Sequence, residues 1–191
     1  MNNSLIFVPA VLTQAPDITA LINAAFRSEP SGQTWLTDNQ DKRTDMLYVE
    51  NVQDTLSNLA TPILVGTVAT SPELIAVCLL KAPGTCPNTE GTPAKSWLSM
   101  LAVDPKYHQH GYGSAILEQA EMFAREHLGA SRIELNVVNA RVELRAWYGE
   151  KGYQATGQTM EFPYGNHRDG LMAEGLELLV LGKDISAEQP C

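Results

Sequence analysis

Apolar residues along the chain follow two patterns, short continuous runs and stretches with helical spacing. Runs of apolar and β-branched residues bounded by turn residues predict strands. These predicted strands span residues 5–8, 62–69, 73–81, 96–103, 132–138, 153–162 and 176–181. Apolar residues that recur three and four positions apart predict helices. These predicted helices span residues 16–27, 43–59, 113–128 and 142–150, and Gly129 is placed to end the third of them.

Nothing in the pattern divides the chain into separate domains. The 191 residues contain no internal repeat and no break in composition, and residues 83–93, with three prolines and two glycines, predict a flexible connection. Helices and strands are mixed along the chain. We therefore expect one α/β (α+β) domain with a mixed, mostly antiparallel central sheet of about six to seven strands, flanked by about four helices.

Charge and cysteine content exclude several functions. The chain has 13 Lys and Arg against 22 Asp and Glu, a net charge of −9, which is unfavourable for binding nucleic acids or anionic membranes. Cys78, Cys86 and Cys191 form no C-x-x-C motif, and His108 and His110 have no further ligands nearby, so we expect no disulfide framework and no metal site. The N-terminus lacks a signal peptide pattern, and no run is long enough to span a membrane. We expect a cytoplasmic protein.

The stretch from Leu101 to Gly113 carries the clearest chemical signal. It reads L-A-V-D-P-K-Y-H-Q-H-G-Y-G and joins a predicted strand to a predicted helix. Glycines let the backbone approach a ligand, and the N-terminus of a helix attracts anions such as pyrophosphate. A plain loop and a Rossmann dinucleotide turn are the alternatives. The Rossmann motif fits poorly, because Ile116 stands where a small residue is needed and Asp104–His110 separate the glycines from the strand.

This stretch resembles the pyrophosphate motif of the GNAT superfamily of acyl-CoA N-acyltransferases. That motif reads R/Q-x-x-G-x-G/A and is commonly introduced by V-D-P-x-Y. Here Val103–Tyr107 reads V-D-P-K-Y, and His108, Gly111 and Gly113 follow at the family spacing. His108 replaces the usual Arg or Gln, which leaves the backbone contacts of the loop intact but changes one side-chain contact.

A second GNAT-like motif follows after one predicted helix and one predicted strand. Asn139–Tyr153 reads N-A-R-V-E-L-R-A-W-Y-G-E-K-G-Y, similar to the family pattern N-x-x-A-x-x-x-Y-x-x-x-G-F/Y, with Tyr148 and Gly152 at the family spacing. Asn139 lies two residues earlier than the usual Asn, whose place is held by Arg141. The two motifs together cover about fifty residues, and the order of helices and strands also fits the family.

The resemblance implies a single GNAT-like domain over residues 1–191. Residues 1–93 would form the acceptor-side helices and hairpin, residues 94–152 the acetyl-CoA-binding core, and residues 153–191 the C-terminal strands. The pantetheine arm of acetyl-CoA would pair with the strand before the loop, opposite the splayed strand 132–138, and the pyrophosphate would bind the loop. The cofactor-binding residues implied in this way are Leu101, Ala102, Val103, His108, Gln109, His110, Gly111, Tyr112, Gly113, Ser114 and Asn139.

The same resemblance gives Tyr148 the role of a general acid that protonates the leaving thiolate. From the residues alone, Tyr148 could equally be a packing aromatic, because Leu144, Trp147 and Tyr148 share one helical face. No general base stands out. Glu134 and Glu161 are candidates, although a solvated surface carboxylate is the ordinary interpretation of each. Cysteine catalysis is not indicated, so the acceptor amine would attack the thioester directly in a ternary complex.

The acceptor is indicated only by charge. Residues 28–60 contain six acidic and two basic residues, a net of −4, whereas residues 104–152 have a net of −1. An acidic acceptor side favours a small cationic amine, although an acidic, solvated helix face would have the same composition. The alternatives are acetylation of a protein N-terminus or lysine, and a catalytically silent acyl-CoA-binding module. A homodimer is left open.

Overall fold

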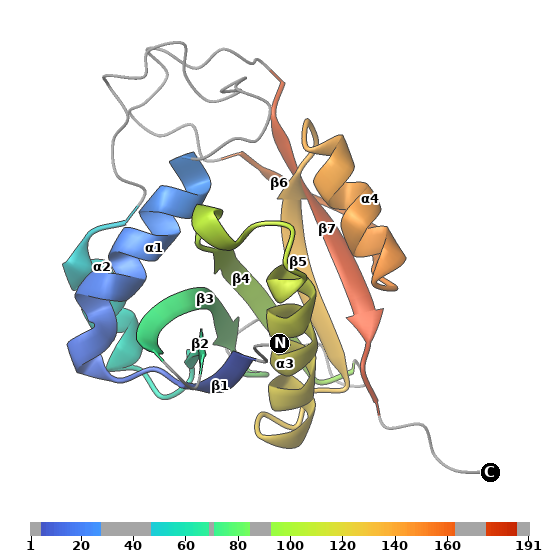
Figure 1. The fold of residues 1–191 in the computed structure, drawn as a ribbon. Coiled ribbons are helices and arrows are strands. Elements are labelled where there is room, and N and C mark those ends of the chain that lie inside the picture. Colours follow the sequence, from blue (N-terminus) through green and yellow to red (C-terminus); the bar gives the residue numbers. More distant parts are fainter. Residues whose placement is uncertain (1–4, 28–46, 69–70, 85–92, 163–174, 187–191) are drawn as a thin grey trace.

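The computed structural model describes residues 5–27, 47–68, 71–84, 93–162 and 175–186, and it has an α/β architecture built on one seven-stranded sheet (Figure 1). The strand order is β1-β2-β3-β4-β5-β7-β6, and every neighbouring pair is antiparallel except β4 and β5. The strands are β1 (Leu5–Pro9), β2 (Ile63–Val68), β3 (Ser71–Lys81), β4 (Lys95–Val103), β5 (Arg132–Val138), β6 (Gln154–Glu161) and β7 (Glu177–Asp184). The helices are α1 (Ala15–Arg27), α2 (Val49–Leu56), α3 (Tyr112–Glu126) and α4 (Val142–Glu150), with short 3₁₀ turns η1 (Leu12–Gln14) and η3 (Pro105–Tyr107).

The predicted helices and strands are present, and most of their boundaries agree to within two residues. The larger differences are in α2, which ends at Leu56 and not at Leu59, and at the end of β7. Helix α2 begins at Val49, and the earlier part of the helix predicted from residue 43 lies largely outside the described residues. Strand β7 continues to Asp184 because its last residues still pair with β5, ending in the pair Arg132 and Asp184. Gly129 follows the end of α3 with a φ of +66°, and Ala130 N donates to Ala124 O at 2.9 Å, as predicted for a glycine that ends a helix. No described helix is long and apolar enough to cross a membrane.

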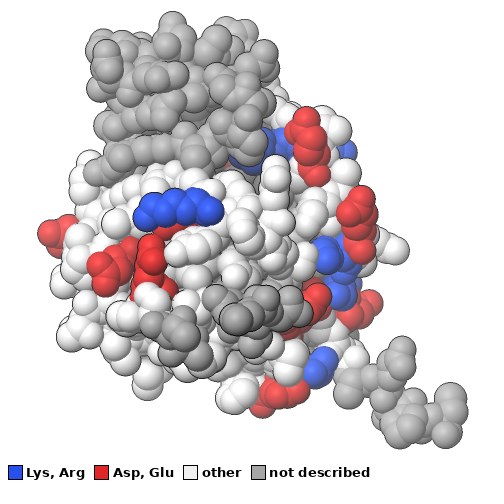
Figure 2. Space-filling view, in the orientation of Figure 1, with Lys and Arg blue, Asp and Glu red and all other residues white. Residues whose placement is uncertain are grey.

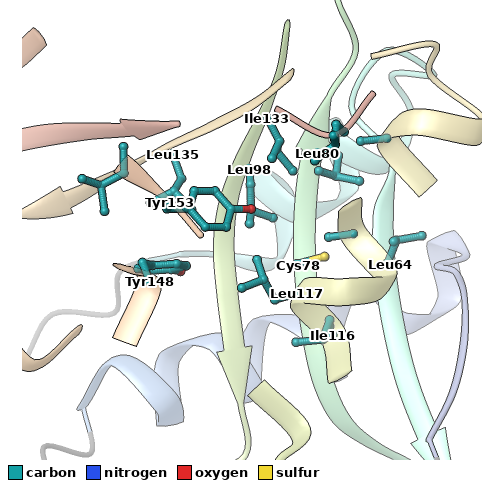
Figure 3. Packing of buried hydrophobic residues seen from close by; sticks show 14 of the residues in the cluster. Leu64, Cys78, Leu80, Leu98, Ile116, Leu117, Ile133, Leu135, Tyr148 and Tyr153 are labelled. Atoms are coloured by element: carbon teal, nitrogen blue, oxygen red, sulfur yellow. The ribbon is translucent and has the colours of Figure 1, made fainter. Parts of the chain in front are cut away.

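The sheet separates two apolar cores. On one face, α1 and α2 bury Ile18, Ile22 and Val52 against β2, β3 and β4. On the other face, α3 and α4 bury Ile116, Leu117 and other side chains against β3, β4, β5 and β7 (Figure 3). Burial of these apolar faces is the main stabilising contribution to the fold, and it holds α3 and α4 at fixed places on the sheet.

Strands β4 and β5 diverge. They pair at only three positions, Lys95 with Arg132, Ser96 with Ile133 and Trp97 with Glu134. Beyond Trp97, the edge of β4 that faces β5 has no paired β5 residue in the described sheet, and Figure 1 shows the two strands separating toward the N-terminus of α3. The splay implied by the GNAT resemblance is therefore confirmed.

Candidate functional site

A β-bulge lies in β4 where the two strands separate. Val77 pairs with Ala102 and Leu79 with Ser99, so two steps along β3 match three steps along β4. Met100 takes the extra place with a φ of +52°. The bulge changes which side chains face α3: Leu98 packs on the α3 face before it, and Leu101 packs there after it. The bulge therefore sets the orientation of the Leu101–Val103 backbone, in the stretch of β4 that β5 does not pair.

The turn after β4 is built by local backbone contacts. The Asp104 Oδ1 atom accepts a hydrogen bond from Lys106 N at 2.9 Å, and Pro105 begins the 3₁₀ turn η3. Gln109 and Gly111 then take left-handed conformations, with φ values of +64° and +79°. This sequence of turns returns the chain to the sheet and starts α3 immediately beside the end of β4.

The N-terminus of α3 faces this turn. Gly111 is the N-cap residue, and the hydrogen bond from Ala115 N to Gly111 O, at 3.1 Å, closes the first turn of the helix. The amide groups of Tyr112, Gly113 and Ser114 precede that bond, so they belong to the positive end of the helix dipole. The predicted cofactor-binding residues 108–114 therefore lie together in one compact turn.

Both histidines of the turn are fixed by backbone carbonyls. His108 Nε2 lies 3.1 Å from Val103 O, and His110 Nδ1 lies 2.7 Å from His108 O. A carbonyl oxygen only accepts hydrogen bonds, so the ring nitrogen donates in each case. His110 also stacks on Tyr112, with ring centroids 5.9 Å apart. His108 thus connects the turn to the last residue of β4.

The turn is also attached to the neighbouring strand β3. The Tyr107 hydroxyl donates to Glu73 Oε2 at 3.1 Å, and this hydrogen bond raises the pKa of Tyr107. Lys106 Nζ lies 3.6 Å from Glu73 Oε1 and 3.7 Å from Asp104 Oδ2. Lys106 and Glu73 are exposed, so their ion pair contributes little stability, but these contacts together limit the movement of η3.

Tyr148 projects from α4 into the core cluster, with 6% of its surface exposed. Its ring packs against Trp147 and Tyr153, at centroid distances of 4.8 and 5.4 Å, and Figure 3 shows it on the β5 side of β4. Burial raises the pKa of Tyr148, with a smaller contribution from Cys78. The hydroxyl therefore keeps its proton at neutral pH, and it makes no hydrogen bond within the described residues. Its position is compatible with both packing and proton donation.

Asn139 lies at the end of β5, where it connects β5 to β7. Its backbone N donates to Glu177 O at 2.9 Å, and its Nδ2 donates to Gly175 O at 3.0 Å. The side-chain oxygen is buried and has no hydrogen-bond partner among the described residues. The amide nitrogen therefore has a structural role, and the predicted cofactor contact of Asn139 stays a prediction.

The expectation that Glu134 is a solvated carboxylate is wrong. Glu134 is 5% exposed, and its Oε1 atom lies 2.8 Å from Arg132 Nε and 3.2 Å from Lys95 Nζ. It stands at the paired end of β4 and β5, and Val103 lies six residues beyond its partner Trp97, about 20 Å along an extended strand. Because Glu134 is paired with two cations and lies this far from Val103, it is no longer a candidate for the general base. Glu161, the other candidate, is exposed at the end of β6.

The described surface on the side seen in Figure 2 carries acidic and basic side chains in small mixed groups. No large field of either sign covers the described part of this face. Nor do the described residues contain a group of three or more His, Cys, Asp or Glu side chains that could hold a metal ion.

Solved structures with the same fold include several acetyltransferases. The ribosomal-protein-S18-alanine N-acetyltransferase from Escherichia coli superposes with a TM-score of 0.68 at 14% identity, covering 97% of each chain. YncA from Salmonella typhimurium, solved with its cofactor acetyl-CoA, gives a TM-score of 0.66 at 16% identity and covers 98% of each chain. The ribosomal-protein-alanine N-acetyltransferase from Brucella melitensis gives 0.65 at 20% identity, covering 94% of this chain and 99% of that one. At these identities the likeness shows the fold.

Comparison with curated proteins gave no match. The family model described as the acetyltransferase (GNAT) family matches residues 18–153, which include both sequence motifs, the diverging strands and the glycine turn. The chain therefore belongs to the GNAT family of acetyltransferases, which are acyltransferases that use acetyl-CoA.

Proposed function

We propose that this protein is an N-acetyltransferase that transfers the acetyl group of acetyl-CoA to a primary amine. The observation that carries the proposal is the junction between the open edge of β4 and the glycine turn at the N-terminus of α3. An extended arm that ends in a pyrophosphate needs hydrogen-bonding backbone along its length and an anion site at its end. The open edge of β4 provides the first of these and the glycine turn provides the second, one after the other along the chain. The residues present therefore fit acetyl-CoA.

The chain's own residues would hold the donor mainly through backbone groups. Leu101–Val103 would pair with the pantetheine arm, and the amides of residues 108–114 would bind the pyrophosphate. Space for that contact exists at Gly111, because a Cβ built there meets no atom within 4 Å. The buried Oδ1 atom of Asn139, which has no described partner, is available to accept one further hydrogen bond. Acetyl-CoA, when bound, supplies an activated acetyl thioester.

Tyr148 would provide the proton that the departing sulfur needs. Burial raises the pKa of its hydroxyl, so this group stays protonated throughout the neutral range; the same shift makes it a weaker acid, so the proposed role rests on its position and on its match to the family motif. No described cysteine is suited to a covalent route, because Cys78 is fully buried and its burial raises the thiol pKa to about 12. Direct attack by the amine in a ternary complex is therefore the route that the described residues support.

A small cationic amine is the acceptor that we propose. The acid excess of the chain lies outside the segment assigned to acetyl-CoA, and Glu50 and Asp54 are exposed on α2. The other acidic residues of the acceptor side, at positions 29, 38, 41 and 45, lie outside the described residues. A protein N-terminus is the second candidate, because two proteins of similar fold are ribosomal-protein alanine N-acetyltransferases.

A panel of amines with acetyl-CoA, measured by release of free thiol, tests both parts of the proposal. Butylamine and 1,4-diaminobutane form a matched pair that differs by one positive charge, and a short peptide with an N-terminal alanine represents the alternative. We expect kcat/KM to be about tenfold higher for the diamine, which corresponds to about 1.4 kcal/mol. Equal values for the two amines would refute the charge argument. Binding of acetyl-CoA without turnover of any amine would instead support a silent binding module.

A further inference from the structure

A buried polar group lies next to Tyr148 and has no part in the function proposed above. It consists of Glu121 on α3, Tyr153 just before β6, and Lys183 on β7. Lys183 Nζ lies 2.6 Å from Glu121 Oε2 and 5.7 Å from the centroid of the Tyr153 ring. The Glu121 side chain is only 12% exposed, and Tyr153 is 4% exposed. A carboxylate in this position is costly unless it is well paired, which points to a specific role.

The two remaining polar atoms of this group are complementary. The Tyr153 hydroxyl and Glu121 Oε1 are both buried, and neither has a hydrogen-bond partner within geometric limits among the described residues. One atom is a donor and the other an acceptor. Burial raises the pKa of Tyr153, and the nearby Glu121 carboxylate raises it further. The hydroxyl therefore stays protonated, and the Glu121 side chain that raises its pKa belongs to another element of the fold.

Tyr153 contacts Tyr148 in two ways. Its backbone N donates to Tyr148 O at 3.0 Å, and the two rings meet edge to face at an interplanar angle of 67°. Trp147 also packs on the Tyr148 ring, but it belongs to α4 and moves with that helix. Tyr153 lies beyond the end of α4, with Lys183 of β7 over its ring and Glu121 of α3 near its hydroxyl. It can therefore fix Tyr148 relative to the rest of the molecule.

Helix α3 is the element that makes this link relevant to catalysis. Glu121 stands nine residues after Tyr112, about 13 Å along the helix from the glycine turn. Close to that turn, a Cβ built on Gly113 would lie 3.7 Å from the Trp147 ring, so α3 approaches α4 there as well. The helix that begins at the proposed pyrophosphate site thus reaches the aromatic cluster around Tyr148 from two points.

We propose that Tyr153 and Glu121 are positioning residues that hold the Tyr148 hydroxyl in register with the acetyl-CoA site. This inference rests on the proposed function, because it assigns Tyr148 the role of proton donor. Lys183 neutralises Glu121 and packs against the Tyr153 ring. Neither Tyr153 nor Glu121 needs to touch the substrates, and both act through Tyr148.

Kinetics of the full chain with the Tyr153→Phe and Glu121→Gln variants test the inference. Phe keeps the ring and Gln keeps the shape, so both variants retain the packing of the core. We expect each change to lower kcat about threefold to fivefold, because small displacements of a catalytic group slow the chemical step. The KM for acetyl-CoA and the rise in melting temperature with acetyl-CoA should stay within about twofold of the parent. Glu126→Gln, at an exposed ion pair on the same helix, is the matched control.

The decisive measurement repeats both changes in a Tyr148→Phe background. If Tyr153 and Glu121 act through the Tyr148 hydroxyl, kcat in that background falls no further. An equal loss of kcat in both backgrounds would show a general structural role and would overturn the inference while leaving the proposed function intact. An unchanged kcat in the single variants would overturn it as well. If Tyr148→Phe itself retains full activity, the acid role fails and the inference fails with it.

Discussion

Two glycines at opposite ends of α3 offer a controlled test of the acetyl-CoA site. Gly111 precedes the helix with a φ of +79°, and Gly129 follows it with a φ of +66°. A Cβ built on either residue meets no atom within 4 Å. The Gly111→Leu and Gly129→Leu variants therefore introduce the same side chain into the same backbone region, one inside the proposed site and one outside it.

The two substitutions should destabilise the free protein equally. An L-residue in the left-handed region costs about 1–2 kcal/mol, and the Cβ adds no steric clash at either position. For a domain of this size, each kcal/mol corresponds to about 2–4 °C, so both variants should melt about 2–8 °C below the parent. Acetyl-CoA at about 100 times its Kd contributes about 2.7 kcal/mol, or about 5–11 °C. We expect Gly129→Leu to keep this increase and Gly111→Leu to lose it.

Differential scanning fluorimetry gives the melting temperatures of the parent and of both variants, with and without acetyl-CoA. These temperatures provide the loss of stability and the acetyl-CoA shift of each variant. The comparison depends on the difference between the two variants, so errors in the absolute cost of left-handed backbone cancel. A full acetyl-CoA shift in Gly111→Leu would show that the glycine turn does not contact the donor. Loss of the shift in both variants would show that binding responds to the stability of α3 and not to its N-terminus.

Three further changes test other parts of the structure. Tyr148→Phe removes only the proton donor, so it should lower kcat roughly tenfold or more in a thiol-release assay. The rise in melting temperature with acetyl-CoA should be kept. Unchanged turnover would assign Tyr148 to packing. Burial raises the pKa of the Cys78 thiol from 9.0 to about 12. At pH values between these two, the thiol keeps its proton in the folded chain but loses it in the unfolded chain. Its contribution to stability is therefore complete below pH 9 and falls by up to about 1.4 kcal/mol per pH unit above it. In urea unfolding from pH 8 to 10.5, the free energy of unfolding should fall less steeply with pH in Cys78→Ala than in the parent. Identical slopes would contradict this. Gly182→Ala would place a Cβ against the Arg132 guanidinium and should cost about 1–3 kcal/mol by urea unfolding; unchanged stability would contradict this and show that the arginine moves freely.

The regular elements were predictable because their apolar patterns are strong. Strand β5 and helix α4 have the predicted boundaries, and the register of β5 with β7 follows from apolar residues on both strands. The glycine turn was predictable for a different reason. Gly111 and Gly113 lie between a strongly apolar strand and an amphipathic helical pattern, and glycines at such a junction predict a turn in which the backbone is free to take a left-handed conformation. The local sequence was therefore enough to predict where the turn lies, as it was for the helices and strands.

The bulge in β4 was not predicted, because the sequence gives no clear signal for it. Residues facing α3 should alternate along the strand, yet Leu98 and Leu101 both face it, so the alternation shifts by one residue at Met100. The shift is hidden because most side chains from Trp97 to Val103 are apolar, which allows either phase. The contacts of Tyr153 with Glu121 and Lys183 could not be predicted at all, since they join three elements that are distant in sequence.

The splay of β4 and β5 explains why so much of the site depends on backbone. Where the strands separate, β4 presents peptide groups that β5 no longer pairs, and such groups are retained in a fold where water or a ligand satisfies them. The divergence follows from three short parallel pairs and one bulge, and no particular side chain in the turn is required for it. If the donor binds these peptide groups as proposed, the site would tolerate His108 in place of Arg or Gln.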